Sequence, residues 1–373
     1  MKIVIKKEIL LEGLNNVSKA LSTRNIIPVL NGIKFEVTKK GVTLTATDND
    51  ISIKHFIDKK NIEKIEEEGT LVIIGKIIVD IVRKLPNDII NLEDLDNTKA
   101  IISTKTSKFD LNCYDLNDFP NIKFEEENSP IKLDTKIFKE IINQTSYAAS
   151  NQASRPLLTG INLKITGNLF ECCATDSYRL AKKTLTLPDT NTNNMNVVIP
   201  SNNINELVKI LEDDDEILEC SIFSNKILFK YKNLLFQSSL LNGSYPNTDN
   251  LIPNTFDINL ELDLNEFYNV IDRASIFAQT KEKNIIELEV KENKLKITSN
   301  SHEVGKVEEK MNCENLDNKN IKISFSSKYM LEVLKTFNNE KIIISLNGEI
   351  KPIIIKEKDD KNLIQLILPI KTF

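Results

Sequence analysis

The stretch PVLNGIKF at residues 28–35, followed by LTATD at residues 44–48, is repeated along the chain. The second copy reads RPLLTGINL at residues 155–163 and FECCATD at residues 170–176, and its glycine and aspartate keep the spacing of the first copy. A looser third copy ends in LKITSN at residues 295–300, with Asn in place of the aspartate. Each unit spans roughly 125 residues, which is enough to bury a core of its own. The repeat therefore predicts three tandem domains.

Two breaks rich in proline and charge separate the repeats. They fall at residues 125–130 and 252–257, and such segments are typical of the links between domains. We therefore expect domains at residues 1–126, 127–254 and 255–373.

Each repeat begins with a helix and carries a second, shorter helix, because apolar residues recur there at helical spacing. Most of the remaining sequence forms short alternating or apolar runs with Asn and Gly between them, which is typical of strands and turns. Because helices and strands do not alternate as βαβ units, we expect α+β domains with mainly antiparallel sheets. The expected helices are residues 9–21, 76–85, 137–148, 201–211, 264–278 and 327–337.

The composition is that of an ordinary globular protein of 373 residues, 40% hydrophobic and 28% charged, with a net charge of −5. We find no apolar run of the roughly 18 residues that a membrane span needs, and no signal-peptide core at the polar start. The five cysteines are odd in number, which indicates a reduced, cytoplasmic protein without a disulfide framework. The negative net charge argues against a surface that is basic overall, but it is consistent with a basic face on one side of the protein.

The sequence contains no convincing catalytic site. The only two histidines, His55 and His302, are too few for a histidine acid–base pair or a histidine-ligated metal. The adjacent cysteines at residues 172–173 lack metal-ligand or redox spacing and are expected to be structural. We therefore expect no catalytic residue, no metal and no cofactor.

Acidic residues offer the remaining candidates for chemistry. Asp48 and Asp176 occupy equivalent repeat positions and are expected to accept local backbone hydrogen bonds in a turn. The acidic run at residues 212–216 is expected to be a solvated loop. An enzyme that uses Asp48 or Asp176 remains an alternative, disfavoured because neither has a base, nucleophile or metal partner in the sequence.

Three further stretches carry a family resemblance. They read ATDSYRLA at residues 174–181, RPLL at residues 155–158 and LILPIKTF at residues 366–373. With the threefold repeat, they resemble the bacterial sliding clamp, the beta subunit of DNA polymerase III, over the whole chain. The resemblance implies a DNA clamp fold: a head-to-tail dimer closes into a ring, with sheets outside and helices lining a hole for DNA. It also implies a processivity factor without chemistry of its own.

The resemblance implies a defined set of partners. They are duplex DNA bound without sequence specificity, the DNA polymerase III alpha subunit, the clamp-loader complex, other proteins with a clamp-binding motif, and a second copy of this chain. No membrane partner is implied. A three-domain protein-interaction scaffold that never encircles DNA is the alternative from another functional class.

The family has one peptide-binding groove between its second and third domains, which accepts short peptides with Gln, Leu and Phe anchors. Here Leu, Ile and Pro would form an apolar floor, and Arg179 with backbone groups would orient the peptide. Ser177, Tyr178 and Asn250 differ from the Gly, His and Arg of some relatives, and would change which peptide is preferred. The matching positions are Leu158, Thr175, Ser177, Tyr178, Arg179, Leu180, Pro246, Asn250, Leu251, Ile350, Pro352, Leu368, Pro369 and Ile370.

DNA contacts in such a ring would be weak, salt-dependent and made to phosphates. Carboxylates on the predicted helices nearly equal the basic residues in number. The sequence therefore does not decide the net charge of the surface that lines the hole. Arg24 and Gln152 align with loop positions that touch DNA in the family. The full set of expected DNA-binding residues is Arg24, Gln152, Lys76, Arg83, Lys84, Lys136, Lys139, Lys209, Lys328 and Lys335.

Ring closure would join the first domain of one chain to the third domain of the other. The resemblance places Lys76, Phe109 and Leu111 against Ile276 and Phe277 of the second copy. Ion pairs with Lys76 would add little, roughly 0–1 kcal/mol each. The acids expected to form them are Glu303, Glu308 and Glu309.

Overall fold

The computed structural model describes most of the chain. The described residues are 1–21, 27–96, 98–126, 129–187, 194–278, 284–301, 305–358, 360 and 362–371. They divide into two compact units: unit 1 comprises Met1–Lys139 and Asn202–Leu240, and unit 2 comprises Glu140–Ser201 and Leu241–Phe373. Over these ranges, no helix is long and apolar enough to cross a membrane.

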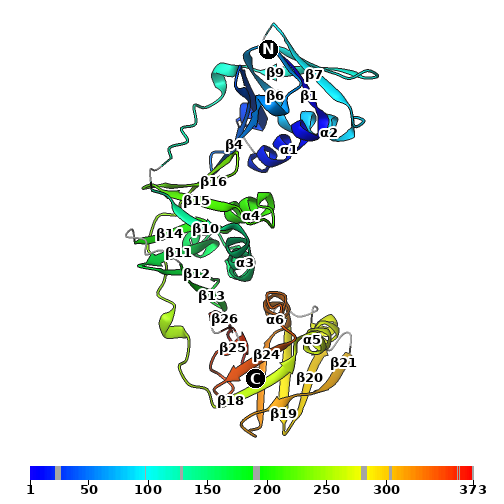
Figure 1. Cartoon of the computed structure of the whole chain (residues 1–373). Helices are drawn as coiled ribbons and strands as arrows, with labels where there is room; N and C mark the ends of the chain where they lie inside the picture. The colour runs from blue at the N-terminus through cyan, green and yellow to red at the C-terminus, as the bar shows by residue number, and fades with distance from the viewer. Residues whose placement is uncertain are drawn as a thin grey trace. The chain divides into compact units, whose positions relative to one another are not determined.

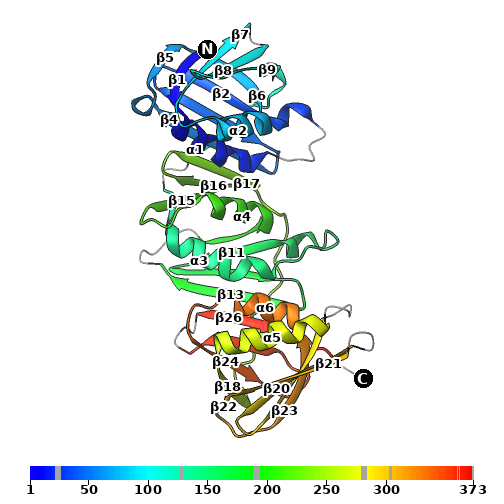
Figure 2. The same ribbon diagram turned by 90° about the vertical axis from the view of Figure 1, so that its right-hand side faces the viewer.

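The described residues of unit 1 form a 13-stranded sheet in which all neighbouring strands are antiparallel. In spatial order the strands are β10 (Ile131–Asp134), β15 (Ile217–Ile222), β16 (Lys226–Tyr231), β17 (Leu234–Ser239), β4 (Ile51–Asp58), β3 (Gly41–Thr47), β2 (Gly32–Thr38), β6 (Gly69–Ile74), β9 (Lys108–Tyr114), β8 (Lys99–Ser103), β7 (Ile89–Leu95), β1 (Lys2–Lys6) and β5 (Lys64–Glu67). Helix α1 (Lys7–Val17) packs on β3 and β4 and beside α2 (Gly75–Lys84) (Figures 1 and 2).

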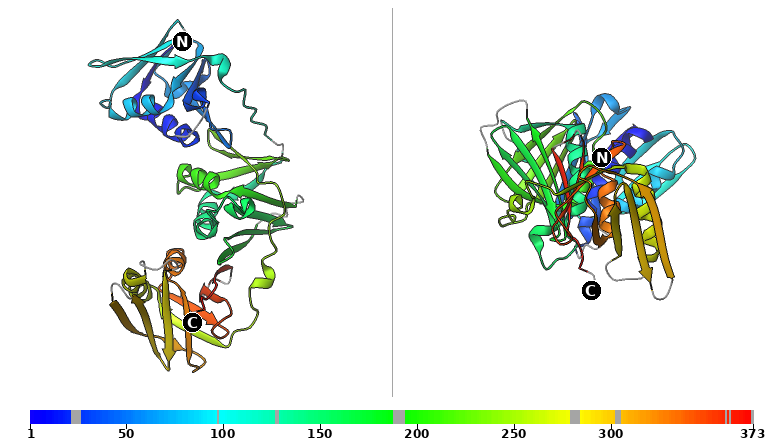
Figure 3. Two further views of the ribbon diagram at one scale, coloured as in Figure 1. Left: turned by 180° about the vertical axis from the view of Figure 1, so that it is seen from behind. Right: turned by 90° about the horizontal axis from the view of Figure 1, so that it is seen from below.

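Unit 2 contains a nine-stranded and a four-stranded antiparallel sheet. Helix α5 (Leu264–Ala278) packs on the smaller sheet and against α6 (Ser327–Leu334) (Figure 3). The larger sheet comprises β14 (Met195–Pro200), β11 (Gly160–Thr166), β12 (Leu169–Thr175), β13 (Arg179–Thr186), β26 (Leu363–Ile367), β25 (Ile353–Glu357), β24 (Lys341–Leu346), β18 (Ile258–Asp263) and β22 (Glu314–Asn315). The smaller comprises β21 (Gly305–Asn312), β20 (Lys294–Ser301), β19 (Ile285–Lys291) and β23 (Ile321–Ser326).

All six expected helices are confirmed, with ends that shift by a few residues. The remaining two are α3 (Thr135–Thr145) and α4 (Ser201–Ile210). Asp263 caps α5 by accepting a hydrogen bond from the Glu266 backbone N–H at 2.7 Å. The core follows the same periodicity, since the inward residues of α5 join the strands around it in one buried cluster.

Strand pairing continues from one sequence repeat into the next at two places. In the first junction, β4 pairs with β17 from Ile51 opposite Ser238 to His55 opposite Leu234. In the second junction, β13 pairs with β26 from Arg179 opposite Ile367 onward. Each junction lies within one unit, and each places the start of a strand beside the end of another.

Candidate peptide-binding site

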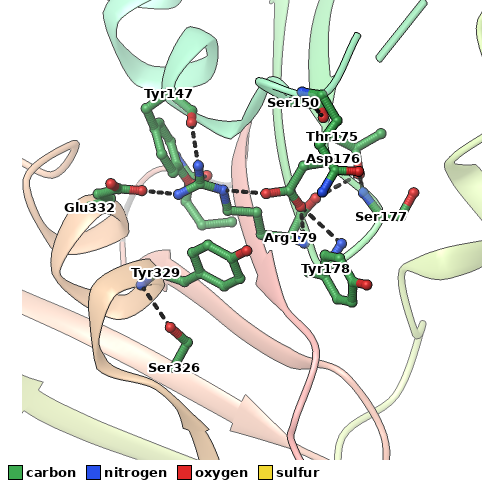
Figure 4. Close-up of polar contacts among 12 residues, drawn as sticks. Tyr147, Ser150, Thr175, Asp176, Ser177, Tyr178, Arg179, Ser326, Tyr329 and Glu332 are labelled. Carbon is green, nitrogen blue, oxygen red and sulfur yellow. Dashed lines mark hydrogen bonds and ion pairs between the residues drawn. The ribbon is translucent and has the colours of Figure 1, made fainter. Parts of the chain in front are cut away.

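The expected turn role of Asp176 is confirmed. Between β12 and β13, its Oδ1 accepts the backbone N–H groups of Tyr178 and Arg179 at 2.9 and 3.0 Å. The Thr175 hydroxyl donates to the Arg179 carbonyl at 2.6 Å and accepts from the Ser177 N–H at 3.1 Å. This rim turn, residues 175–179, places Ser177 at a left-handed φ of 78° (Figure 4).

Arg179 is buried at the base of the rim turn, with 6% of its surface exposed. Its Nε donates to Asp176 Oδ2 at 3.0 Å, its Nη1 to Glu332 of α6, and its Nη2 to the Tyr147 carbonyl at 2.7 Å. The guanidinium carbon lies 5.2 and 4.5 Å from the ring centres of Tyr147 and Tyr329, a cation–π arrangement. From the sequence we expect Arg179 to orient a peptide; in the structure all three guanidinium nitrogens contact this chain and hold the turn.

Backbone hydrogen bonds tie the C-terminal residues to the rim turn and to β23. The Leu368 N–H donates to the Tyr178 carbonyl at 2.8 Å, and the Ile370 N–H donates to the Ser324 carbonyl at 2.7 Å. Tyr178 and Leu368 nevertheless keep 59% and 38% of their surfaces exposed. Two apolar side chains therefore face solvent where β13 begins and β26 ends.

A buried apolar cluster lies beneath this surface. It contains Cys173, Leu180, Ile354 and Leu366, and half-buried residues of the segment 245–256 pack against it. The Tyr245 hydroxyl also accepts the Thr175 backbone N–H at 3.0 Å, which fixes this segment beside the turn. We expect Leu180 to line an open groove, but only 1% of it is exposed, so it supports the site from below.

The sequence-derived site residues therefore separate by exposure. Leu158, Thr175, Arg179 and Leu180 are buried; Pro352, Pro369 and Ile370 are half-buried; Ser177, Tyr178, Pro246, Asn250, Leu251, Ile350 and Leu368 are exposed. Sequence reasoning missed Glu332 and Tyr147, because nothing in their own segments signals an arginine partner. It also missed that Arg155 Nη1 donates to the Ser177 hydroxyl at 2.9 Å.

Several of the expected DNA-binding residues are ion-paired within the chain. In unit 1, Lys136 Nζ lies 2.6 Å from Asp215 Oδ1, and Lys139 Nζ lies 2.5 Å from Asp213 Oδ1. The acidic run at residues 212–216 is thus solvated as expected, but it also contacts α3. Its middle residue, Asp214, contacts Lys232 and Tyr231 instead, which lower the pKa of its carboxyl to about 2.

The other expected DNA-binding residues have varied surroundings. Arg83 and Lys209 each pair with an acid three residues earlier, Asp80 and Glu206. Lys335 lies 6.0 Å from the ring centre of Tyr268. Gln152, Lys76, Lys84 and Lys328 are exposed, and Arg24 falls outside the described residues.

The residues expected to close a ring lie on separate elements. Phe109 and Leu111 are half-buried on β9, while Ile276 is 61% exposed near the end of α5 and Phe277 beside it is half-buried. A hollow of about 640 Å³ adjoins Lys76, and its lining includes Ser18, Leu21, Asn31, Ile77, Asp80, Arg83 and Tyr114. The partners expected for Lys76 have other neighbours here: Glu308 pairs with Lys310 and Glu309 with Arg273, and Glu303 falls outside the described residues.

Burial shifts the pKa of several titratable side chains towards their neutral forms. In the described part of the chain, no group of three His, Cys, Asp or Glu side chains could hold a metal ion. Burial raises the pKa of the Cys172 thiol and raises that of Cys173 to about 11, so both stay protonated. Burial also lowers the pKa of His55 to about 4. His302 falls outside the described residues.

Comparisons with known proteins agree along the whole chain. Models of the N-terminal, central and C-terminal domains of the DNA polymerase III beta subunit match residues 1–123, 132–247 and 249–371. The beta sliding clamps of Staphylococcus epidermidis and Bacillus subtilis are each 38% identical to this chain, and each alignment covers 100% of both proteins. The crystal structure of the B. subtilis DNA polymerase sliding clamp matches with a TM-score of 0.95 at 38% identity. That of the beta subunit from Streptococcus pyogenes DNA polymerase matches with 0.95 at 30%, and both matches cover 100% of each chain. This chain therefore belongs to the family of DNA polymerase III beta subunits, the beta sliding clamps.

Proposed function

We propose that two copies of this chain close head to tail around duplex DNA and tether DNA polymerase III to it. As a beta sliding clamp, the chain is an accessory subunit that carries out no catalysis itself. The observation that carries the proposal is the full-length likeness to sliding clamps at a TM-score of 0.95. Retention on DNA would then be topological. Because bacterial DNA lies in the cytoplasm, the protein would act there.

Partner binding is assigned to the exposed apolar surface of the second junction. Tyr178 and Leu368 expose apolar surface beside a rim that the chain itself holds in place, and such a site suits aliphatic or aromatic anchors. The ligand is a short peptide with a Gln and a Leu-Phe pair. The polymerase alpha subunit, the clamp loader and other motif-bearing proteins would compete for this site.

Ring closure is assigned to the first and third repeats, with boundaries at residues 1–126, 127–254 and 255–373. The exposed Ile276 and the half-buried Phe277 of one copy would meet Phe109, Leu111 and Lys76 of the other. The hollow beside Lys76 is compatible with an inserted side chain from the second copy. Each interface would be heterologous, and two of them complete the ring.

DNA contact is assigned to the set of residues expected from the sequence, and two of them, Lys136 and Lys139, already have carboxylate partners. Phosphates must displace Asp215 from Lys136 and Asp213 from Lys139, and both carboxylates are largely exposed. Such surface pairs contribute roughly 0–1 kcal/mol, so the exchange is feasible but reduces the net attraction. DNA contact would therefore be weak and salt-sensitive, which suits a ring that slides.

Matched asparagine variants test this DNA contact. D215N removes the carboxylate partner of Lys136, and D213N removes that of Lys139, which still donates to the Leu211 carbonyl at 2.8 Å. D214N makes the same change in net charge at a residue that contacts Lys232. D213N and D215N should each strengthen binding to a short duplex about twofold to fivefold at low salt, and D214N should not. Equal effects of all three variants would assign the change to net charge alone.

Retention on circular DNA tests the proposed function itself. The loaded protein should stay on a nicked circle through gel filtration at high salt and should leave when the circle is linearised. I276D, which puts a carboxylate into the proposed interface, should sediment as a folded monomer and should not be retained. Equal retention on circular and linear DNA would favour the scaffold that does not encircle DNA.

A further inference from the structure

The rim turn of the peptide-binding site is fastened to helix α6 by one buried arginine. Arg179 joins Asp176 of the turn to Glu332 of α6 and to the Tyr147 carbonyl (Figure 4). Its guanidinium is enclosed by the rings of Tyr147 and Tyr329. Arg179 is buried, so its N–H groups cannot bind water in place of these acceptors. A buried N–H donor without an acceptor destabilises the fold, because its lost hydration is not replaced.

The same surroundings also fix the other side of the site. The Tyr147 hydroxyl donates to Gln365 Oε1 at 2.6 Å, and Gln365 Nε2 donates to the Gln144 carbonyl at 2.9 Å and to Thr336 Oγ1 at 3.1 Å. Gln365 is fully buried on β26, three residues before Leu368. Tyr147 therefore connects the start of β13, through Arg179, with the strand that delivers Leu368.

The turn does not need an arginine for its own formation. In the first junction, Asp48 Oδ1 accepts the N–H groups of Asp50 and Ile51 at 3.0 and 2.8 Å, and Asn49 has the same φ of 78° as Ser177. The residue that corresponds to Arg179 there is Ile51, which is buried and uncharged. An equivalent turn thus forms without a cation, so formation of the turn does not explain the Arg179–Glu332 pair.

We propose that Glu332 is a positioning residue for peptide binding: it holds Arg179, and through Arg179 it sets where the Ser177–Tyr178 rim stands. Glu332 itself does not touch the peptide. The affinity of the site for a peptide with apolar anchors therefore depends on α6. This inference rests on the proposed function, because it assumes that peptides bind beside Tyr178 and Leu368.

The variant E332Q tests the proposal with a minimal change of shape. The amide keeps the size of the side chain but removes its charge, so Nη1 loses its charged acceptor. The affinity for a fluorescent peptide bearing Gln and Leu-Phe should fall about tenfold, while dimer mass and retention on circular DNA stay parental. E332D retains the charge and should recover part of the affinity. E340Q makes the same chemical change at an exposed side chain beyond α6 and should have no effect.

A double-mutant cycle distinguishes positioning from general stabilisation. Tyr178 is largely exposed, so Y178A should leave the fold intact. If Glu332 acts through the rim, E332Q should weaken peptide binding far less in the Y178A background than in the parent. Parental affinity in E332Q, or equal losses in both backgrounds, would overturn the proposal while leaving the proposed function intact. A parent that binds no such peptide would defeat both.

Discussion

The two strand junctions are built on one plan and differ at three positions that bear on the proposed peptide site. In each, a Thr-Asp turn precedes the first strand, and the end of the second strand donates one N–H to that turn: Ser239 to the Asp50 carbonyl, and Leu368 to the Tyr178 carbonyl, both at 2.8 Å. The strands that pair are β4 with β17 and β13 with β26. Where the first junction has Ile51, Asp50 and Ser239, the second has Arg179, Tyr178 and Leu368.

These three differences separate a structural junction from the proposed binding site. In the first junction, the polar side chains of Asp50 and Ser239 lie at the turn, and the aliphatic side chain of Ile51 is buried. The second exposes Tyr178 and Leu368 and places a paired arginine beneath them. Because corresponding backbone hydrogen bonds hold both turns, the fold supplies the frame, and the side chains would supply the affinity. Exchanging residues between the junctions therefore tests each contribution.

The largest effect should come from giving the first junction the arginine of the second. Ile51 is 3% exposed, and I51R would place a cation there without a counterpart of Glu332. Even with Asp48, the counterpart of Asp176, as a partner, an incompletely paired buried charge should lower the free energy of unfolding by about 4 kcal/mol. Urea denaturation measures this, with I51V, expected to cost about 1 kcal/mol, as the control for lost volume. A fully stable I51R would show that the first junction can solvate a charge.

Acid should weaken the first junction selectively. His55 of β4 is buried between the side-chain amides of Asn16 and Asn233, and burial lowers its pKa from 6.5 to about 4. Between these values the unfolded chain binds a proton that the folded chain excludes. The stability contributed by neutral His55 is therefore complete above pH 6.5 and is lost as the pH falls towards 4, by about 3 kcal/mol.

The H55Q variant isolates the contribution of His55, because glutamine does not titrate. Neither strand of the second junction contains a histidine, so the contribution belongs to the first junction. Urea midpoints of the parent should fall between pH 6.5 and 4 more steeply than those of H55Q. Parallel pH profiles for the two proteins would mean that carboxylates elsewhere cause the acid sensitivity.

Peptide binding should depend on Leu368 but not on its counterpart Ser239. L368D puts a charge at the exposed apolar surface and should weaken binding of the Gln and Leu-Phe peptide by about 2 kcal/mol, roughly thirtyfold. S239D makes a comparable change in the first junction and should leave peptide affinity unchanged. Fluorescence anisotropy measures both. A matching loss in S239D would move the binding site away from the second junction.

The sequence predicted the shared frame of the two junctions but not their differences. Helical periodicity located all six helices, and the equivalent positions of Asp48 and Asp176 predicted their turns, because both signals are local. The pairing of β4 with β17 was not predictable, since an alternating strand can pair with many partners. The resemblance placed Leu180 in the site, but its position in the repeat did not reveal that it faces the core.

Long-range polar contacts were equally hidden. Arg179 and Glu332 are 153 positions apart, and a single glutamate on a short helix carries no sign of its partner. The acidic run at residues 212–216 had a clear local interpretation as a solvated loop, yet two of its carboxylates reach the lysines of α3. Such contacts depend on the packing of whole elements, which residue patterns along one segment do not encode.

The smallest effect concerns the left-handed residue of each turn. Ser177 and Asn49 both have a φ of 78°, but asparagine tolerates this conformation better than serine does. Glycine removes the strain at either position and adds entropy to the unfolded chain. The two terms should nearly cancel in N49G, whereas S177G should be more stable than its parent by about 0.5 kcal/mol. Loss of the exposed Arg155 contact to Ser177 reduces this gain only slightly. Thermal unfolding of both variants against the parent measures the difference, and equal shifts would show that the two turns carry the same strain.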